Sequence, residues 1–536
     1  MDQFSERRPY NAVSEFVDVH TELGRADKIA FIDPDRSLTY GELHARSIRF
    51  ANALRASGLT HENRVALLLH DTIDYPVAFW GTIRSGAIAV PLNTFLTVQQ
   101  YRYILTDSRA SALVIAESLI PTIEPLVGTL PHLRATIVVA DNRKPSSSWL
   151  ALSRHDGKVH AFGDLIANGA DATPFVADTS SDDVAFWLYT SGSTGDPKGV
   201  KHVHSSLMAT AKLFGQGILR IAEDDVVHSA AKLFFAYGMG NAMTFPLSVG
   251  ATAALWPHRP TPDAVFEMMR QYRPTIFYGV PSLYTALLAH PHIGKGAGSD
   301  RLRLCVSAGE ALPAHIGERW RNVVGVDVLD GLGSTEMLQT FLSNRPGDVR
   351  YGSTGKPVPG YETRIVDENG RDLGVDEIGE LIVRGPSAGE GYWNQRAKSR
   401  RTFVGEWTYT GDKYRRDAEG YYYYCGRTDD MFKVSGMWVS PFDVETALAS
   451  HEAVLEAAVI GKKDADGLVK PKAFVVLKNG YAADDGLFEK LKLHVKQQAG
   501  PWKYPRWIEL RKDLPRTATG KIQRFKLRQE DLHGGG

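Results

Sequence analysis

The stretch that bears most directly on the fold is VAFWLYTSGSTGDPKGV, residues 184–200, in which an apolar run passes straight into a loop of small polar residues. An apolar run of this kind, bounded by turn residues, is typical of a strand buried on both faces of a sheet. The loop exposes backbone N–H groups and hydroxyls that suit phosphate oxygens. The candidate phosphate-binding residues are Thr190, Ser191, Gly192, Ser193, Thr194, Gly195 and Lys198.

This loop differs from the common P-loop. In G-x-x-x-x-G-K-[ST] a hydroxyl residue follows the lysine, whereas here Gly199 follows Lys198. The alternative reading is a disordered Ser/Gly linker. Apolar runs flank the loop closely on both sides, which favours a phosphate-binding loop over a linker.

Outward from this loop, the chain alternates strand-like and helix-like segments. Buried-strand runs occur at 64–69 (RVALLL), 111–116 (SALVIA) and 135–140 (ATIVVA), with helix-like stretches between them. A helix is predicted from Leu38 onward, because Thr39 and Glu42 have the spacing of a capping box. The pattern predicts an α/β fold whose large N-terminal domain contains parallel-type α/β subdomains.

The pattern of apolar, glycine and charged residues changes twice toward the C-terminus. Between Tyr351 and Tyr424, glycines and charges interrupt short alternating strands such as YETRIVD and GELIVRG, which predicts a small antiparallel subdomain. The last hundred or so residues have the size of a small independent α+β domain. We therefore divide the chain into an N-terminal domain, residues 1–428, and a C-terminal domain, residues 429–536.

Composition excludes several classes of protein. The 536 residues contain 62 Lys plus Arg and 62 Asp plus Glu, so no net charge attracts nucleic acid or an anionic membrane. No signal peptide or membrane-spanning run is recognised. Cys305 and Cys425 lie far apart in strand-like runs and form neither a disulfide framework nor a metal motif. These features favour the cytoplasm.

Two further stretches have residues suited to a nucleotide. In DGLGSTEM, residues 330–337, Thr335 places a hydroxyl beside the carboxylate of Glu336, and carboxylates hold Mg²⁺ near phosphates. In YTGDKY, Asp412 suits a ribose diol, with Arg427 beside it. The alternatives are a Thr-Glu pair that merely starts a helix and a salt-bridged turn between Arg427 and Asp429.

These stretches, taken in order with SAGEALP (307–313) and PRTATGK (515–521), resemble the adenylate-forming superfamily of acyl-CoA ligases, adenylation domains and luciferases. The resemblance extends from about Leu38 to Arg528. It implies a large N-terminal domain, a mobile C-terminal domain with its hinge at Asp429, and an active site between them. It also implies that the protein uses ATP and Mg²⁺, with coenzyme A as a co-substrate.

The resemblance also implies roles for individual residues. Lys521, Thr335 and Glu336 are expected to be catalytic, with Glu336 also the Mg²⁺ ligand, and Lys433, Ser435 and Gly436 to lie on the CoA side. The expected adenine and ribose contacts are Ala308, Gly309, Glu310, Ala311, Asp330, Gly331, Asp412 and Arg427. From the residues alone, PRTATGKIQR (515–524) favours a plain surface turn between a strand and a last helix. An exposed catalytic Lys521 is also a candidate for a protein acetyltransferase and deacetylase.

The acid substrate is expected to be aromatic. SAAKLFFAYGMGNAMTFPLSVGA, residues 229–251, most resembles benzoate-type aryl-CoA ligases and has no carboxylate in KLFFAYG for an amino-acid substrate. The expected aryl-acid pocket consists of Ala236, Tyr237, Ala308, Gly331, Gly333, Leu338 and Gln339. Gln339 and Thr340 are polar and suit a ring substituent, which favours a hydroxybenzoate over benzoate, and the expected substrate is 4-hydroxybenzoate or benzoate. Alternatives are an adenylyltransferase that loads a separate carrier protein and a catalytically silent nucleotide sensor.

Overall fold

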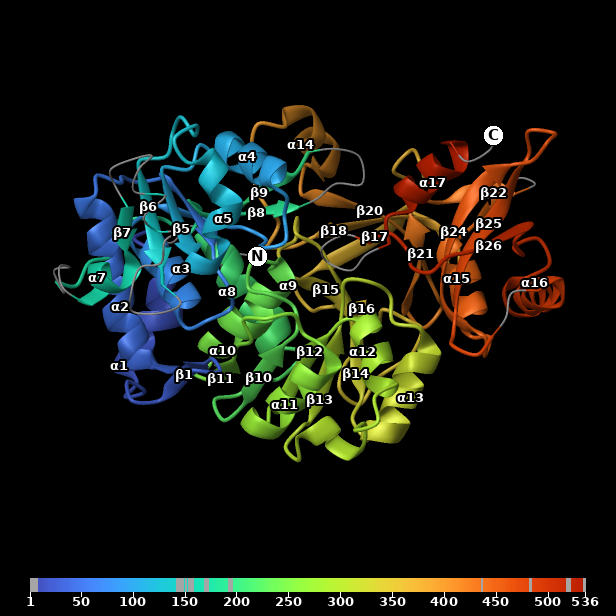
Figure 1. The fold of residues 1–536 in the computed structure, drawn as a ribbon, viewed down its shortest axis with the longest axis horizontal. Coiled ribbons are helices and arrows are strands. Elements are labelled where there is room, and N and C mark those ends of the chain that lie inside the picture. The colour runs from blue at the N-terminus through green and yellow to red at the C-terminus, as the bar shows by residue number, and fades with distance from the viewer. Residues whose placement is uncertain are drawn as a thin grey trace.

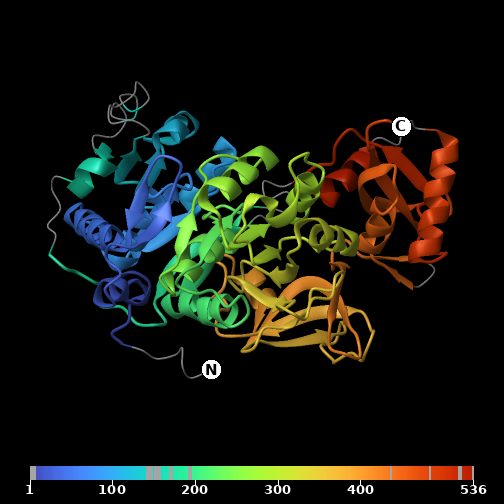
Figure 2. The ribbon, with the colours of Figure 1, turned by 90° about the horizontal axis from the view of Figure 1, so that it is seen from below.

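The computed structural model describes residues 8–140, 149, 152, 159–167, 173–190, 196–434, 437–481, 484–516 and 522–533. Two large sheets with their helices make up most of the molecule, and the C-terminal residues form a separate body at one end of the long axis (Figure 1). Seen after a 90° turn, a smaller sheet built from residues of the 360s to the 420s lies against the second large sheet (Figure 2).

The first large sheet has seven strands and is parallel except at one edge. Strands β3, β4, β5 and β6 pair in parallel, as the apolar runs predict, and β9 closes the edge antiparallel to β8. In spatial order the strands are β7 (Val159–Ala161), β6 (Ala135–Val139), β5 (Ala112–Ala116), β3 (Arg64–Leu68), β4 (Ile88–Pro91), β8 (Val184–Thr190) and β9 (Lys198–Val203).

The second large sheet has nine strands and is parallel through its centre. Strands β14, β13, β12, β10, β11 and β1 run parallel, while β2, β15 and β16 add antiparallel edges. In spatial order they are β16 (Lys356–Pro357), β15 (Thr340–Ser343), β14 (Val328–Gly333), β13 (Leu304–Ser307), β12 (Ile276–Gly279), β10 (Val226–Ser229), β11 (Thr252–Ala254), β1 (Ile29–Ile32) and β2 (Ser37–Thr39).

Helices cover both faces of both sheets. The α-helices of this part are α1 (Val19–Glu22), α2 (Tyr40–Ala56), α3 (Asp74–Arg84), α4 (Val98–Asp107), α5 (Ile120–Ile123), α7 (Phe162–Ala167), α8 (His204–Thr210), α9 (Ala236–Met239), α10 (Phe245–Leu247), α11 (Pro262–Tyr272), α12 (Pro281–Leu288) and α13 (Ala314–Val324). Short 3₁₀- or π-helical turns are η2 (Ser14–Asp18), η3 (Glu117–Leu119), η4 (Glu124–Leu126), η5 (Ala211–Gln216), η6 (Gly240–Thr244) and η7 (Lys295–Gly298).

The predicted capping box of α2 is confirmed: Glu42 N donates to Thr39 Oγ1 (3.1 Å) and Thr39 N to Glu42 Oε2 (2.9 Å).

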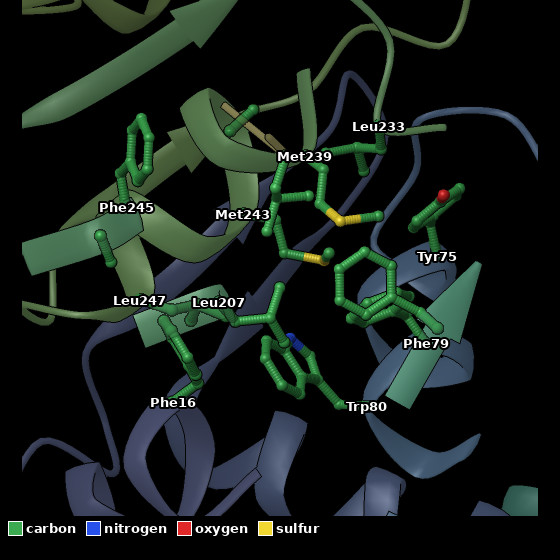
Figure 3. Packing of buried hydrophobic residues seen from close by; sticks show 14 of the residues in the cluster. Phe16, Tyr75, Phe79, Trp80, Leu207, Leu233, Met239, Met243, Phe245 and Leu247 are labelled. Carbon is green, nitrogen blue, oxygen red and sulfur yellow. The ribbon is translucent and has the colours of Figure 1, made fainter. Parts of the chain in front are cut away.

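Alternate residues along each strand face different cores, which explains the continuous apolar runs. In β5, Val114 packs into the core shared by the two large sheets, whereas Leu113 packs into the core beneath α4. The shared core holds Phe79 and Trp80 of α3 against Met239 and Met243, which lie within residues 229–251, the candidate acid-binding segment (Figure 3). The wall of the candidate site is thus anchored directly to the main core.

The smaller sheet is antiparallel, as predicted for residues 351–424. Its strands are β17 (Glu362–Val366), β18 (Gly379–Arg384), β19 (Phe403–Val404), β20 (Trp407–Arg416) and β21 (Tyr422–Arg427), and helix α14 (Arg396–Thr402) precedes β19. The long strand β20 pairs with β18 on one side and β21 on the other.

The C-terminal residues have their own cores, separate from those of the large sheets. Their elements are β22 (Phe432–Val434), β23 (Met437–Val439), α15 (Pro441–Ala449), β24 (Val454–Lys463), β25 (Val469–Leu477), α16 (Asp485–Ala499), β26 (Trp507–Leu510) and α17 (Arg524–His533). Asp429 is exposed, in a turn where Asp430 N donates to Arg427 O (3.0 Å). Asp430 is in turn bound by Arg528 Nη1 of α17 (2.7 Å). The boundary and hinge at Asp429 remain predictions.

Both cysteines are buried and free, Cys305 in β13 and Cys425 in β21, as their strand-like surroundings predict. Among the described helices, none has the length and apolar character needed to cross a bilayer.

Candidate active site

The carboxyl end of β13 and the middle of β14 bring buried polar groups together. Ser307, the last residue of β13, is the register partner of Asp330, and the Ser307 hydroxyl and one Asp330 carboxylate oxygen have no hydrogen-bond partner in the structure. Burial raises the pKa of Asp330 well above its usual value, an effect that the backbone N–H groups of Leu312 and Gly331 only partly offset. Buried polar groups are nearly always bonded, so unpartnered ones at a strand edge suit a ligand.

The segment after β13 turns sharply at Gly309, whose φ of +94° lies in the left-handed region that favours glycine. Ala308 is buried, and Glu310 and Ala311 follow at the start of the connection to α13. This places the four predicted adenine-side residues next to Ser307, at the same edge as Asp330 and Gly331.

The predicted ribose pair lies on neighbouring strands of the small sheet. Asp412 of β20 and Arg427 of β21 are register partners, and Arg427 Nη1 donates to Asp412 Oδ1 (2.9 Å). The negative charge of Asp412 raises the pKa of Arg427. Arg427 therefore pairs with Asp412, not with Asp429 as in the alternative reading. The aspartate is 7% exposed, while the arginine side chain remains 46% exposed and open to an added partner.

Thr335 and Glu336 lie on the loop between β14 and β15 and are held from two sides. His202 Nε2 lies 2.8 Å from the Thr335 carbonyl, and burial lowers the pKa of His202 to about 4, so the neutral ring donates this bond. The Glu336 carboxylate accepts from the Tyr392 hydroxyl (2.7 Å) and lies 3.9 Å from Lys198 Nζ.

Thr190 and Lys198 end and begin the paired strands β8 and β9, and they are register partners. The predicted loop residues Ser191, Gly192, Ser193, Thr194 and Gly195 lie outside the described residues, as do Lys521, Ser435 and Gly436. Lys433 is exposed on β22, where it pairs with Trp438 of β23. The roles assigned to these residues remain predictions.

The predicted aryl-acid residues do converge. Gln339 Nε2 donates to the carbonyl oxygens of Ala236 (3.3 Å) and Tyr237 (3.2 Å), which joins α9 to the loop immediately before β15. The Tyr237 hydroxyl reaches the carbonyl oxygens of Gly279 (3.3 Å) and Val306 (3.2 Å) across the sheet. Of the neighbouring aromatic residues, Phe234 is core, whereas Phe235 and Tyr237 are half-buried.

The interpretation of Gln339 as a partner for a ring hydroxyl requires correction, whereas that of Thr340 stays a prediction. Gln339 Oε1 already accepts from the backbone N–H and the hydroxyl of Thr340, both at 3.0 Å, so its amide has no free hydrogen-bonding group. Gln339 therefore stabilises the wall of the pocket and does not recognise a ring substituent.

The glycines of β14 are also needed for packing within the protein. A Cβ on Gly331 would lie 2.9 Å from Thr340 Cγ2, and one on Gly333 would lie 2.8 Å from the Gln339 backbone. These glycines let β14 pack against β15, a constraint that the ligand-centred interpretation did not include. Leu338 at the same turn has φ +66°, a conformation that costs energy for a leucine and is common where function constrains the backbone.

The site fits a magnesium nucleotide. No group of three or more His, Cys, Asp or Glu side chains able to hold a metal occurs among the described residues. Magnesium is usually bound by one or two carboxylates, with substrate phosphates and water completing the shell. Glu336 fits this description, because it is a single, partly buried carboxylate near Lys198, the first residue of β9.

Sequence reasoning missed Tyr392 and His202. Tyr392 lies 56 residues from Glu336 along the chain, and His202 lies 133 residues from Thr335. The only local signal for Tyr392 is its place in GEGYW, 389–393, where glycines surround an aromatic pair.

Comparisons with known proteins extend over nearly the whole chain. A family described as AMP-binding enzyme matches residues 20–393, and its C-terminal domain family matches 443–521. The 4-hydroxybenzoate–CoA/benzoate–CoA ligase of Rhodopseudomonas palustris is 53% identical over 528 residues, 98% of this chain and 95% of that protein. The benzoate CoA ligase structure from Burkholderia xenovorans LB400 is 49% identical, with a TM-score of 0.87 over 97% of this chain and 100% of that chain. Anthranilate CoA ligase AuaEII, solved with anthranoyl-AMP, is 40% identical, with a TM-score of 0.92 over 100% of both chains.

Proposed function

Because this chain belongs to the family of AMP-binding enzymes, we propose that it is an ATP-dependent aryl-acid CoA ligase, an acid-thiol ligase of the AMP-forming type. The observation that carries the proposal is the 53% identity to an aryl-acid CoA ligase over 98% of the chain. The buried, unpartnered polar groups of Ser307 and Asp330 support it, since they lie where a nucleotide base is expected.

The reaction has two steps. An oxygen of the aryl carboxylate attacks the α-phosphorus of ATP, the bond to the bridging oxygen breaks, and pyrophosphate leaves the acyl-adenylate. The CoA sulfur then attacks the acyl carbon, its proton is released, and AMP leaves with the former carboxylate oxygen. No general base is needed in the first step, because the carboxylate is already ionised near neutral pH.

The main barrier in the first step is electrostatic, because two anions meet and charge grows on the phosphoryl oxygens. Lys198 adds positive charge from β9, and the Asp412–Arg427 pair holds the ribose side. When bound, Mg²⁺ supplies further charge neutralisation beside Glu336. Lys521 bridges the carboxylate and the α-phosphate in this proposal, and the C-terminal domain then rotates at Asp429 to admit CoA along Lys433, Ser435 and Gly436.

The substrate we propose is benzoate or 4-hydroxybenzoate. The relative from R. palustris is named for both acids, and the AuaEII structure is named for anthranilate. Since the amide of Gln339 is fully bonded, it offers no reason to exclude an unsubstituted ring.

A coupled assay tests the proposal. Purified protein with ATP, Mg²⁺ and each of benzoate, 4-hydroxybenzoate, 3-hydroxybenzoate and anthranilate should release pyrophosphate, and with CoA present chromatography should detect the aryl-CoA. Pyrophosphate release without thioester from CoA would favour the carrier-protein alternative. Absence of pyrophosphate with every acid would favour the silent sensor.

Lys521→Ala tests the two-step assignment. The rate of acyl-adenylate formation should fall by about 100- to 1,000-fold in the variant, the order expected when a key charge-stabilising group is removed. The variant should still form thioester from a supplied aryl-adenylate. Equal loss of both steps would contradict the proposed rotation of the C-terminal domain.

A further inference from the structure

Residues 389–393, which we term the strap, run alongside β9, the strand that follows the phosphate-binding loop. Glu390 N donates to Lys201 O (2.9 Å), Lys201 N to Gly391 O (3.1 Å) and Trp393 N to Gly199 O (2.8 Å). The strap thus adds short antiparallel pairing to the outer edge of β9, with Tyr392 opposite Val200.

The strap also touches the metal-ligand loop and is fixed at both ends. Gly389 N donates to the backbone carbonyl of Glu336 (2.8 Å), and a Cβ on Gly389 would lie 2.6 Å from Val200 Cγ1. At the other end, Trp393 Nε1 donates to Asp107 O (2.8 Å), and its ring packs on Trp187 with centroids 4.7 Å apart. The backbone position of Tyr392 is therefore determined independently of its hydroxyl.

The Tyr392 hydroxyl lies where three functional groups meet. It donates to Glu336 Oε1 (2.7 Å) and accepts from Lys198 Nζ (3.2 Å). Thr402 Oγ1 lies 3.4 Å away. Tyr392 is 5% exposed, so its ring is buried in the protein.

We propose that Tyr392 is a positioning residue that holds one oxygen of the Glu336 carboxylate so that the other is aimed at the Mg²⁺ of Mg·ATP. The inference rests on the proposed function, since it requires that Glu336 meet Mg²⁺. Magnesium demands near-ideal geometry, and hydrogen bonds that orient a metal ligand raise metal affinity by about 10–100-fold. Tyr392 also links Glu336 to Lys198, so the metal ligand and the end of the phosphate-binding loop share one anchor.

The test is Tyr392→Phe, which removes the hydroxyl and keeps the ring and the strap. Isothermal titration calorimetry should show Mg·ATP binding about tenfold weaker, the lower end of the range for such partners. ATP binding in EDTA should change by less than about twofold. In the variant, the Mg²⁺ concentration that gives half-maximal pyrophosphate release should be higher than in the wild type.

A matched control is Tyr423→Phe. The Tyr423 hydroxyl also donates to a carboxylate, that of Asp417 (3.1 Å), but in a different polar cluster on β21. This variant should leave Mg·ATP affinity unchanged. A comparable loss in both variants would overturn the inference, because it would reflect general destabilisation.

A double-mutant cycle with Glu336→Gln gives a second, independent measurement. If Tyr392 acts through Glu336, adding Tyr392→Phe to Glu336→Gln should weaken Mg·ATP binding by less than about twofold more. Full additivity, or equal loss with and without Mg²⁺, would overturn the inference. Wild-type protein without ligase activity would instead refute the proposed function, so the two failures are distinguishable.

Discussion

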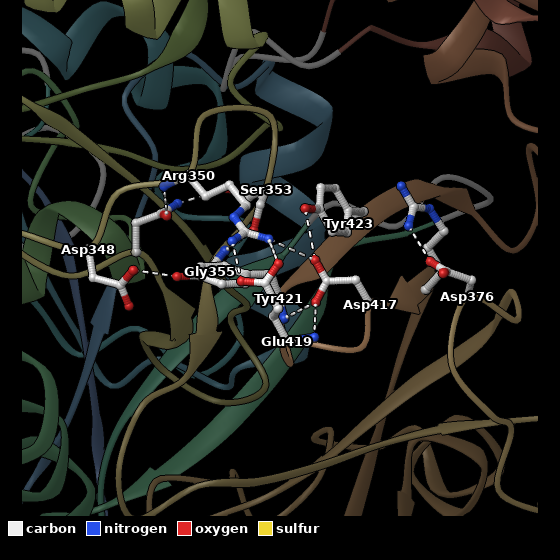
Figure 4. Close-up of polar contacts among 11 residues, drawn as sticks. Asp348, Arg350, Ser353, Gly355, Asp376, Asp417, Glu419, Tyr421 and Tyr423 are labelled. Carbon is white, nitrogen blue, oxygen red and sulfur yellow. Dashed lines mark hydrogen bonds and ion pairs between the residues drawn. The ribbon is translucent and has the colours of Figure 1, made fainter.

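Two polar clusters that share the small antiparallel sheet are bonded in opposite ways. In the first, Arg350 donates to Asp417 (3.1 Å) and Glu419 (2.6 Å) and stacks over the ring of Tyr421 (3.8 Å), while Tyr421 donates to Asp348 (Figure 4). Every carboxylate in this cluster has a partner inside the protein. We term it the Arg350 cluster.

The second cluster is the name we give to two pairs of predicted nucleotide-binding residues, Ser307 with Asp330 on β13 and β14 and Asp412 with Arg427 on β20 and β21. In this cluster the Asp330 carboxylate and the Ser307 hydroxyl are buried with unused bonding capacity, and the Asp412–Arg427 pair keeps one half exposed. Unpaired buried groups cost stability, and internally paired ones do not. A protein retains such a cost mainly where a ligand completes the bonding, so the second cluster marks the site and the Arg350 cluster supports the scaffold.

Asp412→Ala should break the second cluster most severely. Loss of a charged hydrogen-bond acceptor for the ribose, with Arg427 left unpaired, should weaken ATP binding by about 100-fold, in line with hydrogen bonds to charged groups. Calorimetry with ATP measures it. Asp372→Ala, which breaks the exposed Arg364–Asp372 pair (2.7 Å) on the same sheet, should leave ATP affinity unchanged. Equal effects of both changes would remove the distinction between site and scaffold.

Gln339→Glu tests a fully bonded group inside the site. A carboxylate cannot donate to the carbonyl oxygens of Ala236 and Tyr237, so both lose their partner and face a negative charge. We expect kcat/KM for benzoate to fall by about 30-fold, with a much smaller change in the KM for ATP. If both parameters change together, Gln339 does more than shape the acid pocket.

Asp330→Asn tests whether the pH dependence of stability reflects the raised pKa of Asp330. Because the folded-state pKa of Asp330 is raised, the folded protein holds a proton that the unfolded chain has lost, and stability contributed by this group falls as pH rises above the unfolded value near 4. Asparagine does not titrate. The Tm difference, variant minus wild type, should therefore increase from pH 4 to pH 7 in ligand-free protein. A difference independent of pH would show that Asp330 has a normal pKa.

Arg350→Ala should have the smallest effect. Its closest ion-pair partner, Glu419, is 68% exposed and Arg350 itself 35%, and exposed ion pairs contribute little, so Tm should fall by about 2 °C or less. ATP affinity and kcat should stay at wild-type values. A large loss of ATP affinity would mean that the Arg350 cluster communicates with the site.

Much of the fold was predictable because it depends on local pattern. The apolar runs of β3, β5 and β6, the capping box at Thr39 and the alternating strands β17 and β18 were all read correctly, since burial on one or two faces leaves a periodic trace. Asp412 and Arg427 are joined by only one turn between adjacent strands, so their pairing was also within reach of local reasoning.

Other features depended on sheet order and long-range packing. The use of Gln339 as an internal clamp, the fit of Gly331 and Gly333 against β15, and the convergence of Lys198, Glu336 and Tyr392 join residues with no shared periodicity. By itself the sequence determined the strands, the helix starts and the chemical types available for a nucleotide site. Only the tertiary structure decided which polar groups satisfy one another and which remain open, because hydrogen bonds act over about 3 Å between segments far apart along the chain.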